Sequence, residues 1–146
     1  MIKKLILILV LVASCKSQNV PLKNSKDKDV WSILFADGFK EDHVDLFLNG
    51  QEVIKNGYLY SDESDGVTTL WIRIIKEKGG FYISNFQEKT LKPMNLKIDE
   101  IELNLIYKGV NKKNKFKKND GKFLIIRDNG KGELIISQSK KQLLFY

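Results

Sequence analysis

Residues 44–54 read Val-Asp-Leu-Phe-Leu-Asn-Gly-Gln-Glu-Val-Ile, and this stretch decides the fold. Two short runs that contain apolar residues flank Asn49-Gly50. A type I′ turn needs positive φ at two consecutive residues, and Asn-Gly is the pair that supplies it most readily. The stretch therefore predicts an antiparallel β-hairpin.

Further turn signals follow along the chain. Asn129-Gly130 separates two apolar runs in the same way, with room for an extra bulge at Gly132, and Asn56-Gly57 and Gly79-Gly80 are weaker copies. Short runs of β-branched and aromatic residues between such signals are typical of strands. We predict strands at Trp31–Ala36, Val44–Leu48, Gln51–Lys55, Gly57–Tyr60, Val67–Lys76, Gly80–Asn85, Leu96–Tyr107, Lys122–Asp128, Glu133–Gln138 and Gln142–Tyr146.

These strands predict an all-β fold. Val67–Ile75 is apolar on both faces, as in a central strand. The alternation in Leu96–Leu105 slips at Asp99-Glu100, which indicates a β-bulge. An antiparallel β-sandwich of about eight to ten strands, in a single domain over residues 30–146, fits best. A small β-barrel is the alternative, and Asn95–Ile106 is the one stretch whose pattern also fits a short helix.

The amino-terminal residues 1–14, MIKKLILILVLVAS, have the pattern of a secretory signal. Two lysines precede an apolar run from Leu5 to Ala13, and small residues follow. The run has nine residues, whereas a helix that spans a bilayer needs roughly 20. We therefore expect residues 1–14 to be a cleaved signal peptide rather than a membrane span.

The signal ends at the only cysteine of the chain. Val12-Ala13-Ser14-Cys15 resembles the lipobox of bacterial lipoproteins. The resemblance implies a diacylglyceryl group on the Cys15 thiol, cleavage before Cys15 and an acylated amino terminus, with fatty chains such as palmitate that anchor the protein stably. An ordinary secretory signal with an unrelated cysteine is the alternative. Lys16 is not the aspartate that resembles the inner-membrane retention rule, so a cell-envelope address at the outer membrane is favoured.

The chain between the anchor and the domain is polar. Residues 16–29 read KSQNVPLKNSKDKD and cannot bury enough apolar surface to fold alone, so residues 15–29 form the lipidated cysteine and a flexible tether. Without residues 1–14, 23 basic and 18 acidic residues remain, a balance that favours anionic surroundings.

Two neighbouring segments offer candidate binding groups. Ser61–Gly66 contains Asp62, Glu63 and Asp65, hard oxygen donors of the kind that calcium takes, so a structural calcium held with Asp37 or Glu41 is a candidate, with solvated turn residues as the alternative. Tyr58 and Tyr60 share one strand face beside this loop and could stack on a sugar ring. The other aromatic candidates are Trp31, Trp71, Phe81 and Tyr82, of which Trp71 is expected in the core.

Residues 108–122, KGVNKKNKFKKNDGK, hold seven lysines. We expect a long exposed hairpin loop, in which a block of like charge is often an interaction segment. Candidate partners are anionic lipid, acidic polysaccharide and an acidic protein face, and no nucleic acid is expected for a secreted lipoprotein. The candidate binding residues are Lys112, Lys113, Lys115, Lys117 and Lys118.

The sequence has no enzyme motif, and we expect no catalytic residues and no cofactor. His43 is the only histidine and is interpreted as a surface strand residue, and the lack of His and Cys pairs disfavours zinc. The first functional hypothesis is a non-enzymatic envelope module that binds a glycan or an envelope protein. An inhibitor or immunity-type protein and a small hydrolase are the alternatives. The oligomeric state is left open.

Overall fold

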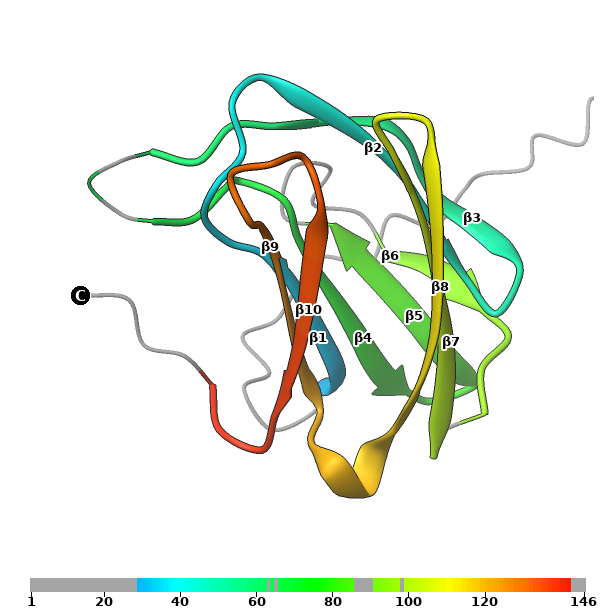
Figure 1. Ribbon diagram of the computed structural model, residues 1–146. Helices are drawn as coiled ribbons and strands as arrows, with labels where there is room; N and C mark the ends of the chain where they lie inside the picture. Colours follow the sequence, from blue (N-terminus) through cyan, green and yellow to red (C-terminus); the bar gives the residue numbers. More distant parts are fainter. Residues whose placement is uncertain (1–28, 63, 65, 86–90, 98, 143–146) are drawn as a thin grey trace, which may run out of the picture.

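The computed structural model describes residues 29–62, 64, 66–85, 91–97 and 99–142. Figure 1 shows two facing layers of strands over this part of the chain. Sheet A has six strands in the order β10-β9-β1-β4-β5-β6, and sheet B has four in the order β3-β2-β7-β8. The predicted β-sandwich is confirmed. A barrel is wrong, because the described strands form two sheets rather than one closed sheet.

The strands and the one short 3₁₀-helix of the described residues have the following bounds: β1 Asp29–Phe35, β2 Asp42–Leu48, β3 Gln51–Leu59, β4 Trp71–Glu77, β5 Gly80–Asn85, β6 Leu91–Met94, β7 Glu100–Tyr107, β8 Val110–Lys117, η1 Lys118–Asp120, β9 Phe123–Asp128 and β10 Leu134–Ser139.

The core lies between the two sheets and follows from strict alternation along the strands. On β1 the inward side chains are Trp31, Ile33 and Phe35, all 0% exposed. On β7 every second residue from Ile101 to Tyr107 is buried in the same cluster. With no cysteine in the described residues, packing of these apolar side chains holds the two sheets together.

Sheet A is centred on β1, which pairs antiparallel with β4 and parallel with β9. The antiparallel prediction is therefore wrong for this one pair. The chain leaves sheet B after β8, passes through η1 and enters sheet A at Phe123, opposite Ser32. Because β9 is reached by this crossing rather than by a hairpin from β1, it can run in the same direction as β1.

The turns match the sequence in part. Asn49 and Gly50 have φ angles of 49° and 79°, which confirms the predicted turn between β2 and β3. Asn56, with φ 52°, lies inside β3, where the register with β2 shifts. Asn56-Gly57 is thus a bulge rather than a turn, and the two strands predicted on either side of it are one.

Of the strand predicted over Leu96–Tyr107, only β7, Glu100–Tyr107, is a strand, and β6, which ends at Met94, was not predicted. β6 is an edge strand of sheet A, a position where Pro93 removes no hydrogen bond from the interior of the sheet. β7 lies in sheet B. The slip at Asp99-Glu100 is therefore the end of a crossing between the sheets and not a bulge. The helical alternative for Asn95–Ile106 is wrong, because Glu100–Tyr107 is a strand.

The lysine-rich segment is a strand and not a loop. Lys108 and Gly109, with φ angles of 49° and 75°, make a two-residue turn, and β8 pairs with β7 over its whole length. β8 is the edge of sheet B, a position where lysines oppose pairing with another chain. The predicted exposed hairpin loop is therefore wrong in its conformation.

The two ends of the sequence mostly lie outside the described residues. This applies to the predicted signal, to Cys15 and nearly all of the tether, and to residues 143–146 of the last predicted strand. β1 begins at Asp29, one residue before the predicted start of the domain. In the part of the chain that the structure describes, no helix is long and apolar enough to cross a membrane.

Candidate functional site at the loop end

Two loops meet at the end of the sandwich where β1 finishes. Residues 36–41 join β1 to β2, and residues 60–70 join β3 to β4. Figure 1 shows both loops, in blue to cyan and in green, at the same end of the molecule. They enclose a hollow of about 720 Å³, which we call the loop-end hollow. It is lined by Asp37, Gly38, Phe39, Lys40, Glu41, Tyr60, Ser61, Asp62 and Gly66.

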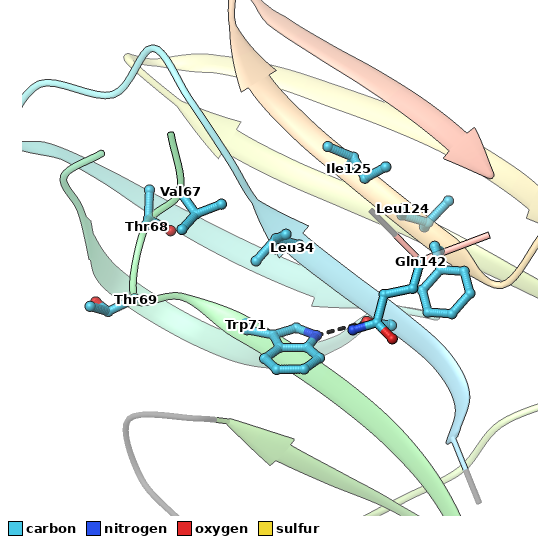
Figure 2. A pocket seen from close by; sticks show the side chains of 10 residues that line it. Leu34, Val67, Thr68, Thr69, Trp71, Leu124, Ile125 and Gln142 are labelled. Carbon is cyan, nitrogen blue, oxygen red and sulfur yellow. Dashed lines mark hydrogen bonds between the residues drawn. The ribbon is translucent and has the colours of Figure 1, made fainter. Parts of the chain in front are cut away.

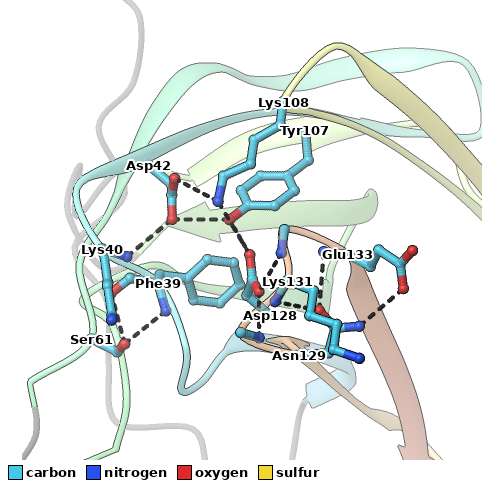
Figure 3. Close-up of polar contacts among 12 residues, drawn as sticks. Phe39, Lys40, Asp42, Ser61, Tyr107, Lys108, Asp128, Asn129, Lys131 and Glu133 are labelled. Carbon is cyan, nitrogen blue, oxygen red and sulfur yellow. Dashed lines mark hydrogen bonds and ion pairs between the residues drawn. The ribbon is translucent and has the colours of Figure 1, made fainter.

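Ser61 ties the two loops together. Its backbone N–H donates to the Phe39 carbonyl at 3.1 Å, and its hydroxyl donates to the same carbonyl at 2.9 Å. The same hydroxyl oxygen accepts the backbone N–H of Phe39 at 2.9 Å. Figure 3 shows this pair beside the polar network described below. Three hydrogen bonds between the loops give the hollow a fixed wall.

Phe39 anchors the first loop in the core. Its side chain is 1% exposed and makes edge contacts with Phe35 and Tyr107, at ring-centroid distances of 5.9 and 5.8 Å. The residue before it, Gly38, has φ 93°, and a Cβ there would lie 2.2 Å from the Asp128 carbonyl oxygen. Only glycine therefore lets the loop approach β9 this closely.

A largely buried polar network supports the loop that joins β1 to β2 (Figure 3). The Tyr107 hydroxyl lies 2.9 Å from an Asp42 oxygen and 2.6 Å from an Asp128 oxygen. The Lys108 ammonium lies 3.1 Å from Asp42 and 3.4 Å from Asp128. Asp42 and Tyr107 belong to sheet B and Asp128 to sheet A, so the network joins the two sheets next to the hollow.

The network fixes the protonation of its members. Burial pushes the pKa of Asp128 up, but hydrogen bonds from Tyr107, Gly130 N–H and Gly132 N–H, together with Lys108, outweigh it and hold the pKa below its usual range. Burial is likewise outweighed at Asp42 by the Lys40 N–H, Tyr107 and Lys108, and the pKa is lowered. Burial, and then the two carboxylates, raise the pKa of Tyr107. Near neutral pH the carboxylates are ionised and the phenol is neutral, an arrangement suited to support rather than to proton transfer.

The turn between β9 and β10 is part of this support. Asp128 accepts the backbone N–H groups of Gly130 and Gly132 at 2.7 and 3.1 Å. Gly130 and Gly132 have positive φ angles, whereas Asn129 does not. The predicted hairpin is present, but the turn is wider than the predicted Asn-Gly pair because it wraps around the Asp128 carboxylate.

The rim of the hollow carries an exposed aromatic ring. Tyr60 is 52% exposed, and Tyr58 is 45% exposed on the same face, with buried Leu59 between them. Tyr60 lines the hollow, as expected for a residue beside the acidic loop, whereas Tyr58 does not line it and makes an edge contact with His43 at a ring-centroid distance of 5.6 Å. His43 is exposed on β2, where the sequence placed it.

Two of the carboxylates that line the hollow already have partners within the protein. Asp37 pairs with Arg127 at 2.6 Å, and Asp62 accepts the N–H and the hydroxyl of Ser64, which lowers its pKa. Asp37, Glu41 and Asp62 do line one hollow, as the calcium prediction requires, but Glu63 and Asp65 lie outside the described residues. Among the described residues no group of three or more His, Cys, Asp or Glu is placed to hold a metal ion.

Trp71 corrects one aromatic prediction. It was expected in the core, but it lies on the outer face of sheet A, half-buried, and its indole N–H donates to the Ser32 hydroxyl at 2.7 Å. Trp31 takes the core position instead. Phe81 packs against the core from β5, while Tyr82 is half-buried. Trp71 helps to line a second, apolar hollow of about 300 Å³ over β9, β1 and β4 (Figure 2), which we call the outer-face cavity.

The candidate lysines are dispersed along β8. Lys113 pairs with Glu102 at 2.8 Å, and the register places Lys115 and Lys117 opposite Glu102 and Glu100. Lys112 turns the other way and donates to the Leu134 carbonyl of β10 at 2.5 Å. Lys118 lies in η1. The predicted cationic block is therefore partly balanced by the acidic residues of the neighbouring strand.

The residues that hold the hollow together were not predicted from the sequence to act as a group; Asp42 was considered only as a carboxylate partner of His43. Asp42, Tyr107 and Asp128 are far apart in the chain and belong to no motif. One signal was available: each stands at or next to a strand end, and Asp128 precedes Asn-Gly.

No family model, no curated protein and no solved structure matches the chain.

Proposed function

We propose that this protein is a lipid-anchored binding module of the bacterial cell envelope that takes a sugar in the loop-end hollow. The observation that carries the proposal is the half-exposed Tyr60 ring on a hollow that is also lined by three acidic residues, Lys40 and Ser61. A sugar ring presents an apolar face to an aromatic side chain and hydroxyls to charged and polar acceptors. The hollow offers both kinds of group side by side.

The direction of β1 supports the link between anchor and site. β1 starts at Asp29, where the tether from Cys15 would join, and ends at Phe35, immediately before the loop that lines the hollow. Seven extended residues separate the two ends by roughly 20 Å. A domain tethered through Asp29 would thus carry the hollow at the end away from the membrane, where an envelope glycan is accessible.

The charges of the hollow narrow the class of sugar. Glu41 and Asp62 line the hollow together with Lys40, while Asp37 is paired with Arg127. Carboxylates accept hydrogen bonds from hydroxyl or amino groups and repel other carboxylates. We therefore expect neutral sugars or amino sugars to bind in preference to uronic acids.

The alternatives fit the geometry less well. A hydrolase of the kind considered would need His43 or paired carboxylates in a pocket, but His43 is exposed, and Asp42 and Asp128 are occupied by Tyr107 and Lys108. An inhibitor that acts through a protruding cationic loop would need the lysines of β8 in a loop, and they lie in a paired strand.

The sugar proposal is tested by calorimetric titration of the full chain in detergent with chitotetraose, cellotetraose and tetragalacturonate. We expect one of the two uncharged oligomers to bind, and Tyr60→Ala to abolish the heat signal. Tyr82→Ala, an aromatic substitution on β5 away from the hollow, is the matched control and should bind as the wild type does. Binding that survives Tyr60→Ala, or preference for the uronic acid, would contradict the proposal.

The anchor is tested separately by growth with an alkyne-bearing palmitate and detection of the labelled protein. The wild-type chain should be labelled, and the Cys15→Ser chain should not. Equal labelling of both, or of neither, would remove the lipid anchor and leave the sugar proposal to its own test.

A further inference from the structure

Part of the outer face of sheet A is apolar, although this face does not contact the other sheet. Its outward residues on β9 and β4 include Ile125 and Ile75, which are 4% and 1% exposed although neither belongs to the core cluster. Leu34, Trp71 and Phe123 lie nearby and are half-buried. A solvent-facing sheet surface ordinarily alternates to polar residues. Apolar residues at these positions are expected where another segment or molecule covers the surface.

The cavity on this face is lined mainly by apolar side chains and offers few hydrogen-bonding groups. Figure 2 shows Trp71, Leu34, Ile125 and Thr68 around it. Several polar groups of its wall are already paired, since Ser32 accepts the Trp71 indole N–H and the Thr68 hydroxyl donates to the Phe35 carbonyl at 2.8 Å. Water in such a cavity would find few partners. An apolar occupant is therefore favoured.

The chain itself carries an apolar segment at the rim. Gln142 lines the cavity, and the next four residues, Leu143-Leu144-Phe145-Tyr146, are all apolar or aromatic; they lie outside the described residues. We propose that residues 143–146 lie across the outer-face cavity and place apolar side chains in it. The occupant is thus a segment of the same chain, independent of the sugar proposed for the loop-end hollow.

The reach of the segment fits the span of the cavity. The strand residues of the lining come from β9, β1 and β4, which are consecutive in sheet A, so this part of the cavity spans two interstrand spacings, or about 10 Å. Val67, Thr68, Thr69 and Gln142 complete the lining. Four extended residues cover about 13 Å. Residues 143–146 can therefore cross from β9, next to Gln142, to β4 without displacing any described strand.

The test compares the full chain with a chain that lacks residues 143–146 and with the Leu144→Asp/Phe145→Asp variant. If the segment covers the cavity, both changes should shift Trp71 emission to the red, increase its quenching by acrylamide and increase binding of anilinonaphthalene sulfonate. The same changes in a Trp71→Phe background should leave the remaining Trp31 emission unaltered, because Trp31 is in the core. Unchanged Trp71 emission and dye binding would overturn the proposal.

A cross-link gives an independent readout of the same contact. In the Cys15→Ser background, Thr69→Cys and Phe145→Cys should form an intramolecular disulfide on mild oxidation, because Thr69 lines the cavity. Asn49→Cys with Phe145→Cys, which places one thiol at the β2–β3 turn of sheet B, is the control and should stay reduced. Equal cross-linking in both pairs, or a disulfide-linked dimer in place of the intramolecular product, would contradict docking in cis.

Discussion

The loop-end hollow and the outer-face cavity of sheet A differ in what builds them. The first is formed by two loops, and its polar wall depends on Ser61 and on the network behind Phe39. The second is formed mainly by apolar side chains of three neighbouring strands and of residues 67–69, and the Trp71 indole N–H on its wall is paired with Ser32. Polar groups in a loop must be held by other hydrogen bonds, whereas an apolar surface on a sheet needs only alternation. The two sites should therefore respond differently to mutation.

The largest effect is expected from Asp128→Ala. The change removes one of the two carboxylates beside the Tyr107 hydroxyl and the acceptor of two backbone N–H groups in a buried position, which should lower the free energy of unfolding by about 3 kcal/mol. Urea denaturation measures this loss. Asp120→Ala, at an exposed carboxylate of η1, is the control and should change stability by less than about 0.5 kcal/mol. Equal losses of unfolding free energy in the two variants would show that the network does not support the fold.

A smaller loss is expected from Tyr107→Phe, which keeps the ring contact with Phe39 and removes only the hydroxyl shared by Asp42 and Asp128. The free energy of unfolding should fall by about 1.5 kcal/mol. If the hollow depends on the network, the affinity for the sugar should fall with it, while the cover of the outer-face cavity, read by Trp71 emission, stays as in the wild type. A change in both sites would show that they are not independent.

The network also makes stability depend on pH. The pKa values of Asp42 and Asp128 are lowered from the ordinary 3.8, so their contribution is present above that pH and is lost as the pH falls below it through the folded-state values. The pKa of Tyr107 is raised from 10.0, so its contribution is present below pH 10 and is lost as the pH rises above it. Melting temperatures across both ranges measure these losses. In Tyr107→Phe the alkaline loss should shrink, and an unchanged alkaline limb would contradict the assignment.

The smallest effect is expected on the outer face of sheet B. Lys113→Gln, Lys115→Gln and Lys117→Gln together should change the free energy of unfolding by less than about 0.5 kcal/mol per site, because these are exposed edge-strand residues. Denaturation in low and high salt measures the change. A loss of several kcal/mol would mean that β8 is held by its charges, and a change in sugar binding would extend the site beyond the loop end.

The parts of the fold that follow from local chemistry could be predicted. Asn49-Gly50 determined its turn, and the alternation around it placed β2 and the first half of β3. Tyr58 and Tyr60 were assigned to one face for the same reason, since residues two apart in a strand share a side. These inferences need only neighbours in sequence.

The remaining features depend on contacts that the sequence does not display. In β8 the lysines suggested a loop, although Lys108-Gly109 is the turn that returns the chain to the edge of sheet B. At Asp99-Glu100 the change of parity looked local, but it marks a crossing between sheets. The network of Asp42, Tyr107 and Asp128 arises only when both sheets are packed.

The most direct test of the account is where a bound sugar lies, read from nuclear Overhauser effects between the uncharged tetrasaccharide that binds and the aromatic rings of the full chain in detergent. The account predicts contacts from sugar ring protons to the Tyr60 ring, and none to Trp71 or Phe123. Contacts to Trp71 or Phe123 would assign the sugar to the outer-face cavity and would contradict both the proposed site and its division from the apolar face.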